Sequence, residues 1–425
     1  MVPKASIIKY LPWALLLVTI NSHGLHSLQL GNTFFWWVIQ FIVLFLFWVI
    51  KNNYTTKYQL KSLFLIRLYL FYILVCFIRG LFIATTYWDW KGLVNNTMCL
   101  LIPIVAFSIN SKYLFQYLIK HFIYYALPLF LAFQFFIGKD EYGFYLAPFS
   151  FLLLFFPLLQ NKWKVLILLI ALYVIFSDFG ARSNVIKFCV PLLMSLLIYF
   201  RKVIGVKIIE FSRLLLFSLP FVFFYLGVFK DFNIFNPNGD KHKPLITNKR
   251  DVNGNLIQED LTADTRTFLY KEVLYTATKY NSWLFGRSPA RGNISDSFGY
   301  LDMNRRNERL GNEVSILNYF TWTGLIGVFL IFTIYFRASY LAINCSNNII
   351  SKIVGLFIAF RWAYSWVEDI NNFYIQYIYL WFFIGFCFSE SFRRMNNKEI
   401  KEWVLGIFSI NKLKQSQDNI KVQLD

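Results

Sequence analysis

Arginines dominate the residues of this chain that could do chemistry. Five candidates among them are Arg79, Arg182 and Arg361, near the ends of apolar runs, and Arg266 and Arg287, in the longest polar segment. The arginine guanidinium stays charged and can bind phosphate oxygens in pairs. Because an arginine at the centre of a bilayer costs about 2.5–3.5 kcal/mol, each of these residues needs a reason for its place. Each either pairs with a carboxylate at the membrane interface or binds an anion. Together they suit a lipid-linked phosphate or pyrophosphate.

Three further residues fit the same chemistry. Glu313 stands where the polar segment meets the next apolar run, and it is the candidate base for a hydroxyl group. It could equally be an interfacial carboxylate paired with Arg309, one helical turn before it. Lys187 adds a cation shortly after Arg182. Trp88 belongs to a group of aromatic residues that either stack on sugar rings or form the usual aromatic belt of a membrane protein.

These residues need a membrane bundle to position them. Of the 425 residues, 57% are hydrophobic and 15% are charged, and mean hydropathy is +0.49. Soluble domains carry about 25% charged residues, and a membrane span needs about 20 mostly apolar ones. We therefore predict an all-α polytopic membrane protein with about 12 transmembrane helices (11–13) and one large external loop containing an amphipathic helix. The predicted spans are residues 7–22, 33–50, 62–86, 92–110, 118–137, 143–160, 164–178, 184–200, 213–229, 314–336, 350–367 and 371–390.

The distribution of basic residues predicts the orientation. Alternate connections between the apolar runs carry most of the Lys and Arg residues, including both ends of the chain. The positive-inside rule places these connections and both termini in the cytoplasm, so the long polar segment is external or periplasmic. The net charge of +19 then reflects topology, and nucleic acid is not an expected partner. The predicted divisions are 1–229 (first nine helices), 230–313 (external loop), 314–390 (last three helices) and 391–425 (cytoplasmic tail).

The 230–313 loop carries 13 of the 42 Lys and Arg residues and 11 of the 23 Asp and Glu residues. Lipid cannot host such a stretch, so it must lie in water. Its first part, up to Asp260, is rich in Asn, Asp and Gly and predicts an irregular chain. Arg266 lies in the first turn of a predicted helix, where a cation opposes the helix dipole, so it needs a local anion or a function. That helix covers residues 265–280, is capped by Asp264, and has an apolar face formed by Leu269, Val273 and Tyr280.

Several enzyme classes lack their motifs here. The chain has no GxxxxGK[ST] phosphate-binding run and no HExxH zinc motif, and its five cysteines form no CxxC pair. We therefore predict no metal and no cofactor. The connection after the first span, residues 21–33, contains no Asp or Glu. This disfavours the polyprenyl-phosphate glycosyltransferases that place a catalytic carboxylate there.

Three local patterns resemble the bacterial O-antigen polymerase (Wzy) and O-antigen ligase (WaaL) superfamily. They are an entry into a span that combines small residues with an arginine, an Arg-led loop helix closed by an LFG turn, and a return into the membrane that ends in GLxG. In order they are residues 179–184 (FGARSN), 266–287 and 312–327. Two departures matter. The family's Ser-Arg order is changed around Arg182, and Glu313 stands at the position of the family's loop histidine. Ligases are expected to depend on that histidine, which favours the polymerase branch.

The resemblance implies a multi-pass glycosyltransferase of the bacterial cytoplasmic (inner) membrane that polymerises oligosaccharide repeat units for O-antigen, capsule or exopolysaccharide. Its implied partners are undecaprenyl-pyrophosphate-linked oligosaccharide and membrane lipid, and it allows a chain-length regulator protein. The alternatives are a ligase that transfers the glycan to lipid A-core and a flippase of the lipid-linked unit. The flippase is disfavoured because the unusual charges gather at one face. The implied catalytic residues are Arg182, Arg266 and Glu313, and the implied substrate-binding residues are Arg79, Arg287, Arg361, Lys187 and Trp88.

Overall fold

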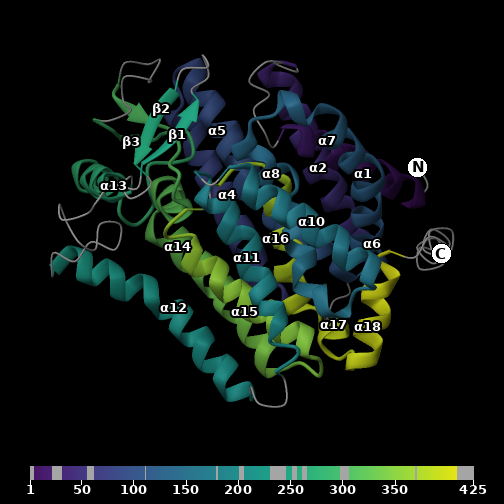
Figure 1. Cartoon of the computed structure of the whole chain (residues 1–425). Coiled ribbons are helices and arrows are strands. Elements are labelled where there is room, and N and C mark those ends of the chain that lie inside the picture. The colour runs from purple at the N-terminus through teal and green to yellow at the C-terminus, as the bar shows by residue number, and fades with distance from the viewer. Residues whose placement is uncertain are drawn as a thin grey trace.

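The computed structural model describes residues 4–21, 31–54, 62–110, 112–178, 180–200, 205–229, 246–250, 256–260, 266–296, 306–368 and 371–408. These residues are mostly helical, and each of the twelve predicted spans coincides with a helix or a run of short helices (Figure 1). The α-helices are α1 (Lys4–Asn21), α2 (Thr33–Tyr54), α4 (Phe64–Ile83), α5 (Tyr87–Leu100), α6 (Lys112–His121), α7 (Leu127–Phe133), α8 (Tyr142–Tyr145), α9 (Ala147–Leu152), α10 (Asn161–Ser177), α11 (Arg182–Leu196), α12 (Val206–Phe229), α13 (Thr267–Lys279), α14 (Ser315–Asn344), α15 (Ile349–Tyr364), α16 (Ile375–Phe388), α17 (Glu390–Arg393) and α18 (Asn397–Gly406). The tighter 3-10 helices are η1 (Ile102–Asn110), η3 (Gln134–Phe136), η4 (Lys139–Glu141) and η5 (Leu153–Leu158), and η2 (Phe122–Ala126) is a π-helix.

Within the described residues, 6 helical segments are long and apolar enough to cross a membrane: Thr33–Ile50, Phe64–Ile83, Tyr87–Ser108, Tyr113–Phe136, Val206–Leu226 and Ser315–Asn344. A bent pair, Lys139–Tyr145 and Ala147–Leu158, adds a seventh if it is one span. The fold therefore has the character of a helical membrane protein. The remaining predicted spans coincide with helices that do not meet this measure of length and apolarity, so the number twelve stays a prediction.

The core is built around α16, whose residues are all buried. A helix that is hydrophobic all round belongs inside a bundle, because no face of it needs water. Its neighbours include α14, α15, α9 and η1. Three tryptophans from α14, α15 and α16 are almost fully buried there: Trp322, Trp362 and Trp381.

The helix α12 lies along one edge of the bundle and packs mainly on α15 and α14 (Figure 1). Its inner contact is a buried arginine, Arg213, which donates two hydrogen bonds to Glu210 at 2.9 and 2.6 Å. Its outward side chains are large and apolar, among them Ile208, Phe211 and Val222. Such a face on a long helix fits lipid rather than water.

The described parts of the 230–313 loop contain one helix and two short antiparallel hairpins. The hairpin of β1 (Ile246–Arg250) and β2 (Leu256–Asp260) lies in the stretch predicted to be irregular, so that prediction was wrong. A second pair joins β3 (Asn293–Ile294) to β4 (Glu308–Arg309). Figure 1 shows β1, β2, β3 and α13 at the same end of the molecule. The predicted cap Asp264 lies outside the described residues.

The helix α13 begins at Thr267, with Arg266 as its N-cap residue. Leu269 and Val273 are buried, as predicted, but Tyr280 is exposed. The buried stripe continues instead through Thr276 and Ala277. Thr276 and Ala277 are small enough to lie on the buried face of α13, where the helix packs against β3 and α14.

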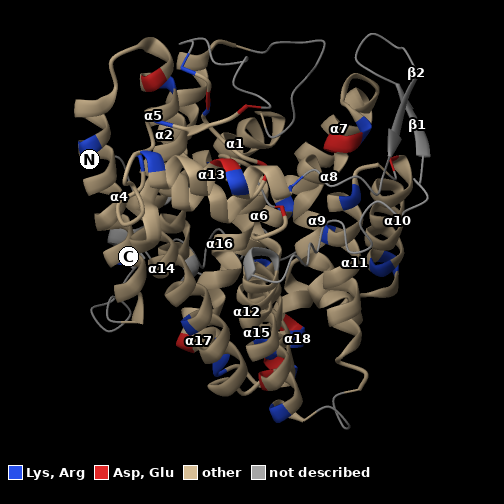
Figure 2. Cartoon of the chain, turned by 90° about the vertical axis from the view of Figure 1, so that its left-hand side faces the viewer, with Lys and Arg blue, Asp and Glu red and all other residues tan. Residues whose placement is uncertain are grey.

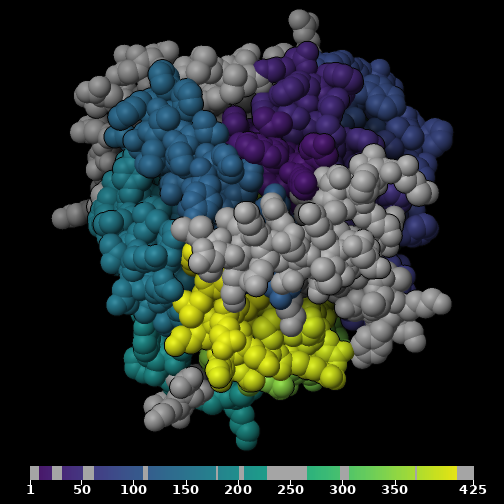
Figure 3. All heavy atoms as spheres, turned by 90° about the vertical axis from the view of Figure 1, so that its right-hand side faces the viewer, coloured from purple at the N-terminus to yellow at the C-terminus, as the bar shows by residue number. Residues whose placement is uncertain are grey.

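The C-terminal helix α18 packs into the bundle. Trp403 stacks on Phe115 with ring centroids 5.8 Å apart, and Gln116 Nε2 donates a hydrogen bond to the Trp403 carbonyl at 2.6 Å. In Figure 3 this segment (yellow) forms part of the surface on the same side as the N-terminal helix (purple).

Candidate functional site

Charged side chains meet where the start of α13 lies beside the start of α14 and the end of α15. Figure 2 marks the positions of the charged residues along the ribbon, with basic ones in blue and acidic ones in red. Arg266 Nη2 lies 3.7 Å from Glu313 Oε2 and 3.7 Å from Glu368 Oε2. Arg309 Nη2 lies 3.3 Å from Glu313 Oε1. We call these four residues the open group, because the Glu313 side chain is 41% exposed. The sequence predicted either a base or a partner of Arg309 at Glu313, and the structure shows the pairing.

Backbone contacts hold the open group in place. Arg266 Nε donates to the carbonyl of Val367 at 3.2 Å, and the Tyr270 hydroxyl donates to the carbonyl of Trp366. Burial raises the pKa of Tyr270, so this hydroxyl remains a neutral donor. The start of α14 is also tied to α15, since Ile316 N donates to the Ser365 carbonyl at 3.0 Å. The beginning of α13 is therefore fastened to the end of α15.

Glu313 itself follows a rigid corner. Asn312 N donates to Asn318 Oδ1 at 2.6 Å, and Asn318 Nδ2 returns a hydrogen bond to the Asn312 carbonyl at 2.8 Å. Asn312 Nδ2 also donates to Asn293 Oδ1 at 3.0 Å. The backbone before Glu313 is thus held on both sides, while its carboxylate faces solvent.

In a second arginine–carboxylate group the carboxylates are buried. We call it the closed group, and it consists of Asp89, Arg287, Arg291, Arg306 and Glu308. Asp89 is fully buried and is ion-paired with Arg306, and Arg291 Nη1 lies 3.9 Å from it. Glu308 Oε1 accepts a hydrogen bond from Arg287 at 3.0 Å and lies 3.3 Å from Arg291 Nη2. The group ties the start of α5 to the loop.

The N-terminus of α5 explains the burial of Asp89. Thr86 caps this helix by accepting a hydrogen bond from Asp89 N at 3.3 Å, and Thr86 N donates to Asp89 Oδ2 at 3.2 Å. Thr85 N donates to the same oxygen at 3.1 Å. This reciprocal capping box points the carboxylate back into the protein, where the arginines meet it.

Two of the predicted substrate-binding arginines have structural partners. Arg287 is buried and donates to Glu308 and to the Gly292 carbonyl at 2.6 Å. Arg79 Nη2 donates to the carbonyls of Phe285 and Gly286 at 2.7 and 2.8 Å. Both side chains hold the loop against the bundle.

The other predicted site residues lie on neighbouring helices. Arg182 is exposed and begins α11. Lys187, on the same helix, is buried, and its Nζ lies 4.0 Å from the centre of the Phe144 ring of α8. Arg361 is buried in the last turn of α15, with its guanidinium 5.7 Å from the Tyr364 ring centre. Trp88 is half-buried, and Lys91 Nζ lies 4.8 Å over its ring. The open group therefore brings Arg266 together with Glu313, whereas Arg182 and Lys187 have their place on α11 beside α8.

The sequence did not single out the carboxylates that organise both groups. These carboxylates are Asp89 and Glu308 in the closed group and Glu368 in the open group. The one available signal for Glu308 was its place inside the basic run 305–309 (RRNER). An acid surrounded by arginines is a candidate for pairing with them, because such a run otherwise repels itself.

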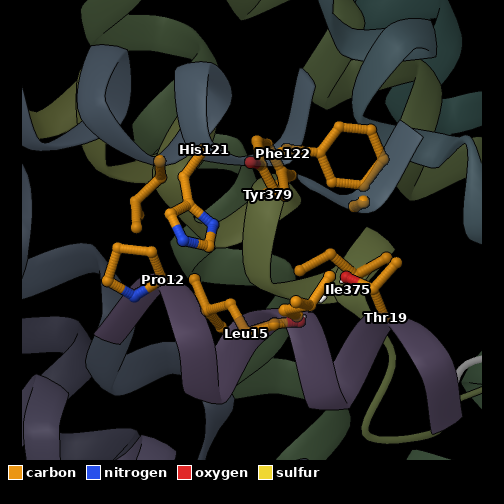
Figure 4. Close-up of a pocket in the computed structure, with 10 residues that line it drawn as sticks. Pro12, Leu15, Thr19, His121, Phe122, Ile375 and Tyr379 are labelled. Atoms are coloured by element: carbon orange, nitrogen blue, oxygen red, sulfur yellow. Dashed lines mark hydrogen bonds between the residues drawn. The ribbon is translucent and has the colours of Figure 1, made fainter. Parts of the chain in front are cut away.

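A small pocket elsewhere is mostly apolar. Pro12, Leu15 and Thr19 of α1 face His121 and Tyr379 across it (Figure 4). His121 Nε2 has no hydrogen-bond partner among the described residues. The described residues contain no group of three or more His, Cys, Asp or Glu side chains that could hold a metal ion. The pocket therefore adds no candidate catalytic residue to the open group.

Comparisons with protein-family models, with curated proteins and with solved structures found no match to this chain.

Proposed function

We propose that this chain is a membrane glycosyltransferase that polymerises oligosaccharide repeat units carried on undecaprenyl pyrophosphate, without a metal. The observation that supports the proposal is the open group. Arg266 and Arg309 flank the exposed carboxylate of Glu313 where α14, a helix of membrane-spanning character, begins. Two guanidiniums beside a candidate base match a reaction that expels a pyrophosphate and removes a proton from a hydroxyl.

In the proposed reaction, the hydroxyl oxygen of an acceptor repeat unit bonds to the anomeric carbon of the donor glycan. The bond between that carbon and the pyrophosphate oxygen breaks, and undecaprenyl pyrophosphate leaves with the bonding electrons. The hydroxyl proton passes to Glu313. Charge grows on the pyrophosphate as it leaves, and fixed guanidiniums are worth most at the point where charge develops. Arg266 and Arg309 supply them.

The remaining predicted site residues divide by their contacts. Arg79 and Arg287 hold the loop, so we propose them as positioning residues rather than substrate contacts. Arg182, Lys187 and Arg361 are proposed to attract the anionic carrier, and Trp88 to contact a sugar ring. In the proposed orientation the open group faces the outside of the inner membrane and both termini are cytoplasmic. This places the reaction where a lipid-linked repeat unit arrives after it has crossed the membrane.

The test is the length of the surface glycan in cells that depend on this chain. Arg266→Ala and Glu313→Gln should leave single repeat units in place of a polymer, with the protein still in the membrane. Lys271→Ala is the matched control, because Lys271 is exposed on the same loop helix. Near wild-type polymer length in both site variants would overturn the proposal.

Deletion of the chain separates this function from its alternatives. Loss of a polymerase leaves single units on the surface. Loss of a ligase leaves the glycan on its undecaprenyl carrier. Loss of a flippase leaves the unit facing the cytoplasm. Either of the last two results would reassign the chain.

A further inference from the structure

The turn that follows α13 presents apolar side chains on the surface of the molecule. Leu284 is 57% exposed and Phe285 is 55% exposed, and Trp283 before them is also exposed. In a segment that must otherwise lie in water, three consecutive large apolar residues are costly to leave uncovered. The turn ends at Gly286, with a φ of 64°.

The carbonyl oxygens of this turn are all paired within the protein. Five consecutive carbonyls, from Ser282 to Gly286, each accept a hydrogen bond. Ser282 accepts from Gly286 N at 2.9 Å, Trp283 from Leu325 N at 2.8 Å, and Leu284 from Ile326 N at 3.3 Å. The last two, Phe285 and Gly286, accept from Arg79 at 2.7 and 2.8 Å.

The donors Leu325 and Ile326 exist because α14 is broken at Gly324, where φ is 67° and ψ is −168°. The break frees backbone N–H groups that a continuous helix would use itself, and the turn fills the gap. Arg287 N completes the joint by donating to the Thr321 carbonyl at 2.6 Å. The fit is close on both sides. A Cβ atom on Gly324 would lie 2.3 Å from the Leu284 carbonyl oxygen, and one on Gly286 would lie 2.6 Å from Gly324 N.

A turn in water does not need such pairing, because water satisfies its carbonyls. In lipid each unpaired backbone group costs several kcal/mol, so irregular backbone at membrane depth has to find partners in the protein. The combination of exposed apolar side chains with fully paired carbonyls is therefore typical of a segment immersed in lipid.

The surface beside the turn is of the same kind. Leu325 and Phe329 of α14 are exposed, and so are Ile78 and Phe82 of α4, with Phe82 85% exposed. Both helices are long and apolar enough to span a membrane. Arg79 lies on α4 next to Ile78 and reaches the turn, so the apolar surface runs from these helices onto the loop.

We propose that residues 283–286 dip into the outer leaflet of the membrane and anchor the 230–313 loop there, with lipid as the partner of their side chains. The occupant is lipid because the patch continues the outward surface of helices of membrane-spanning character. The anchor follows α13 in the chain, so it fixes the far end of the helix whose near end carries Arg266. This inference depends on the membrane character of the fold and, for the choice of leaflet, on the predicted orientation, but not on the proposed glycosyltransferase activity.

A depth measurement on the full chain in lipid nanodiscs tests the proposal. In a background with Cys189→Ser and Cys345→Ser, which removes the cysteines that are not buried, a fluorophore is attached at Leu284→Cys. Asp296→Cys, an exposed polar position of the same loop, is the matched control. Quenching is measured with iodide in the water and with phospholipids that carry a nitroxide at the headgroup or along the acyl chain.

The fluorophore at position 284 should lose most of its emission to the acyl-chain nitroxides and little to iodide, and the one at 296 should show the reverse. Strong iodide quenching at 284 would overturn the proposal. Protection from iodide that disappears in discs holding one copy of the protein would also overturn it, because a second copy and not lipid would then cover the patch. A failure of the proposed glycan synthesis would not change either quenching result.

Discussion

The open and closed groups use the same two kinds of side chain and differ in burial. In the closed group, Asp89 and Glu308 are buried among arginines, and hydrogen bonds from backbone and side chain surround Asp89. In the open group, Arg266 lies 3.7 Å from each of its two carboxylates, beyond hydrogen-bond distance, and Glu313 faces solvent. A pair whose carboxylate is buried between arginines is suited to holding the fold together. A loose, exposed one can exchange a carboxylate for a ligand.

The two groups also differ in what they connect. The closed group joins the loop to α5, and the open group joins the start of α13 to the ends of α14 and α15. If the closed group fixes the loop, damage to it should appear as lost stability. If the open group is the site, damage to it should appear as lost activity in a stable protein.

The largest expected effect on stability is that of Asp89→Asn in the closed group. Asparagine keeps the shape but leaves Arg306 and Arg291 without the buried charge that they face. Removing one partner of a buried ion pair costs about 3–5 kcal/mol. We expect a marked fall in the thermal unfolding midpoint in detergent and a low yield of monodisperse protein. Wild-type stability in this variant would contradict the structural role of the closed group.

Gly324→Ala should have the next largest effect. With φ at 67° and ψ at −168°, Gly324 has a backbone conformation that essentially only glycine adopts, and it costs an ordinary residue about 1–3 kcal/mol. The new Cβ would also lie 2.3 Å from the Leu284 carbonyl oxygen. The turn should leave the break in α14, which lowers the unfolding midpoint and exposes the 284 fluorophore to iodide. Gly311→Ala is the control, because its nearest neighbour would be a Trp322 ring atom at 4.0 Å. Equal behaviour of the two variants would show that the joint is not required.

The contacts of Asp89 and the conformation of Gly324 could not be predicted from the sequence, although other features could. The 6 apolar helices of membrane-spanning length could be located because hydropathy is a local property. The buried face of α13 could be predicted at Leu269 and Val273 from the local pattern of apolar residues. The need of Arg266 for an anion also followed locally, from its place in a first helical turn. The pairing of Arg306 with Asp89 joins residues 217 positions apart, and no local pattern encodes it.

The break at Gly324 is similar. The sequence GLIG is typical of an apolar span and does not predict a break. The broken conformation is stabilised by hydrogen bonds from Leu325 N and Ile326 N to the carbonyls of Trp283 and Leu284. The β1–β2 hairpin was missed because its strands are polar and carry no alternation of apolar residues. Backbone pairing decided both features, over a long separation in the chain at Gly324 and over a short one in the hairpin.

Arg266→Ala should affect stability less and activity more. Its ion pairs are long and partly exposed, and such pairs contribute about 0–1 kcal/mol. Removing one fixed donor from a developing charge costs about 10²–10³-fold in turnover. We therefore expect single repeat units on the cell surface and a nearly unchanged unfolding midpoint. Arg266→Lys keeps the positive charge but loses the planar guanidinium with its paired N–H donors, so it should recover part of the activity. A loss of stability as large as that of Asp89→Asn would place Arg266 with the closed group instead.

Glu313→Gln should have the smallest effect on stability, a few tenths of a kcal/mol for an exposed ion pair. The amide keeps the size of the side chain and still accepts a hydrogen bond from Arg309, but it cannot take a proton. General bases contribute about 10²–10⁴-fold to turnover, so polymer length should collapse while the protein remains folded. Glu368→Gln is the sharper control, since Glu368 lies as far from Arg266 as Glu313 does, at 3.7 Å. If Glu368→Gln abolished the polymer and Glu313→Gln did not, the open group would still be the site, but the proton would go to the carboxylate at the end of α15.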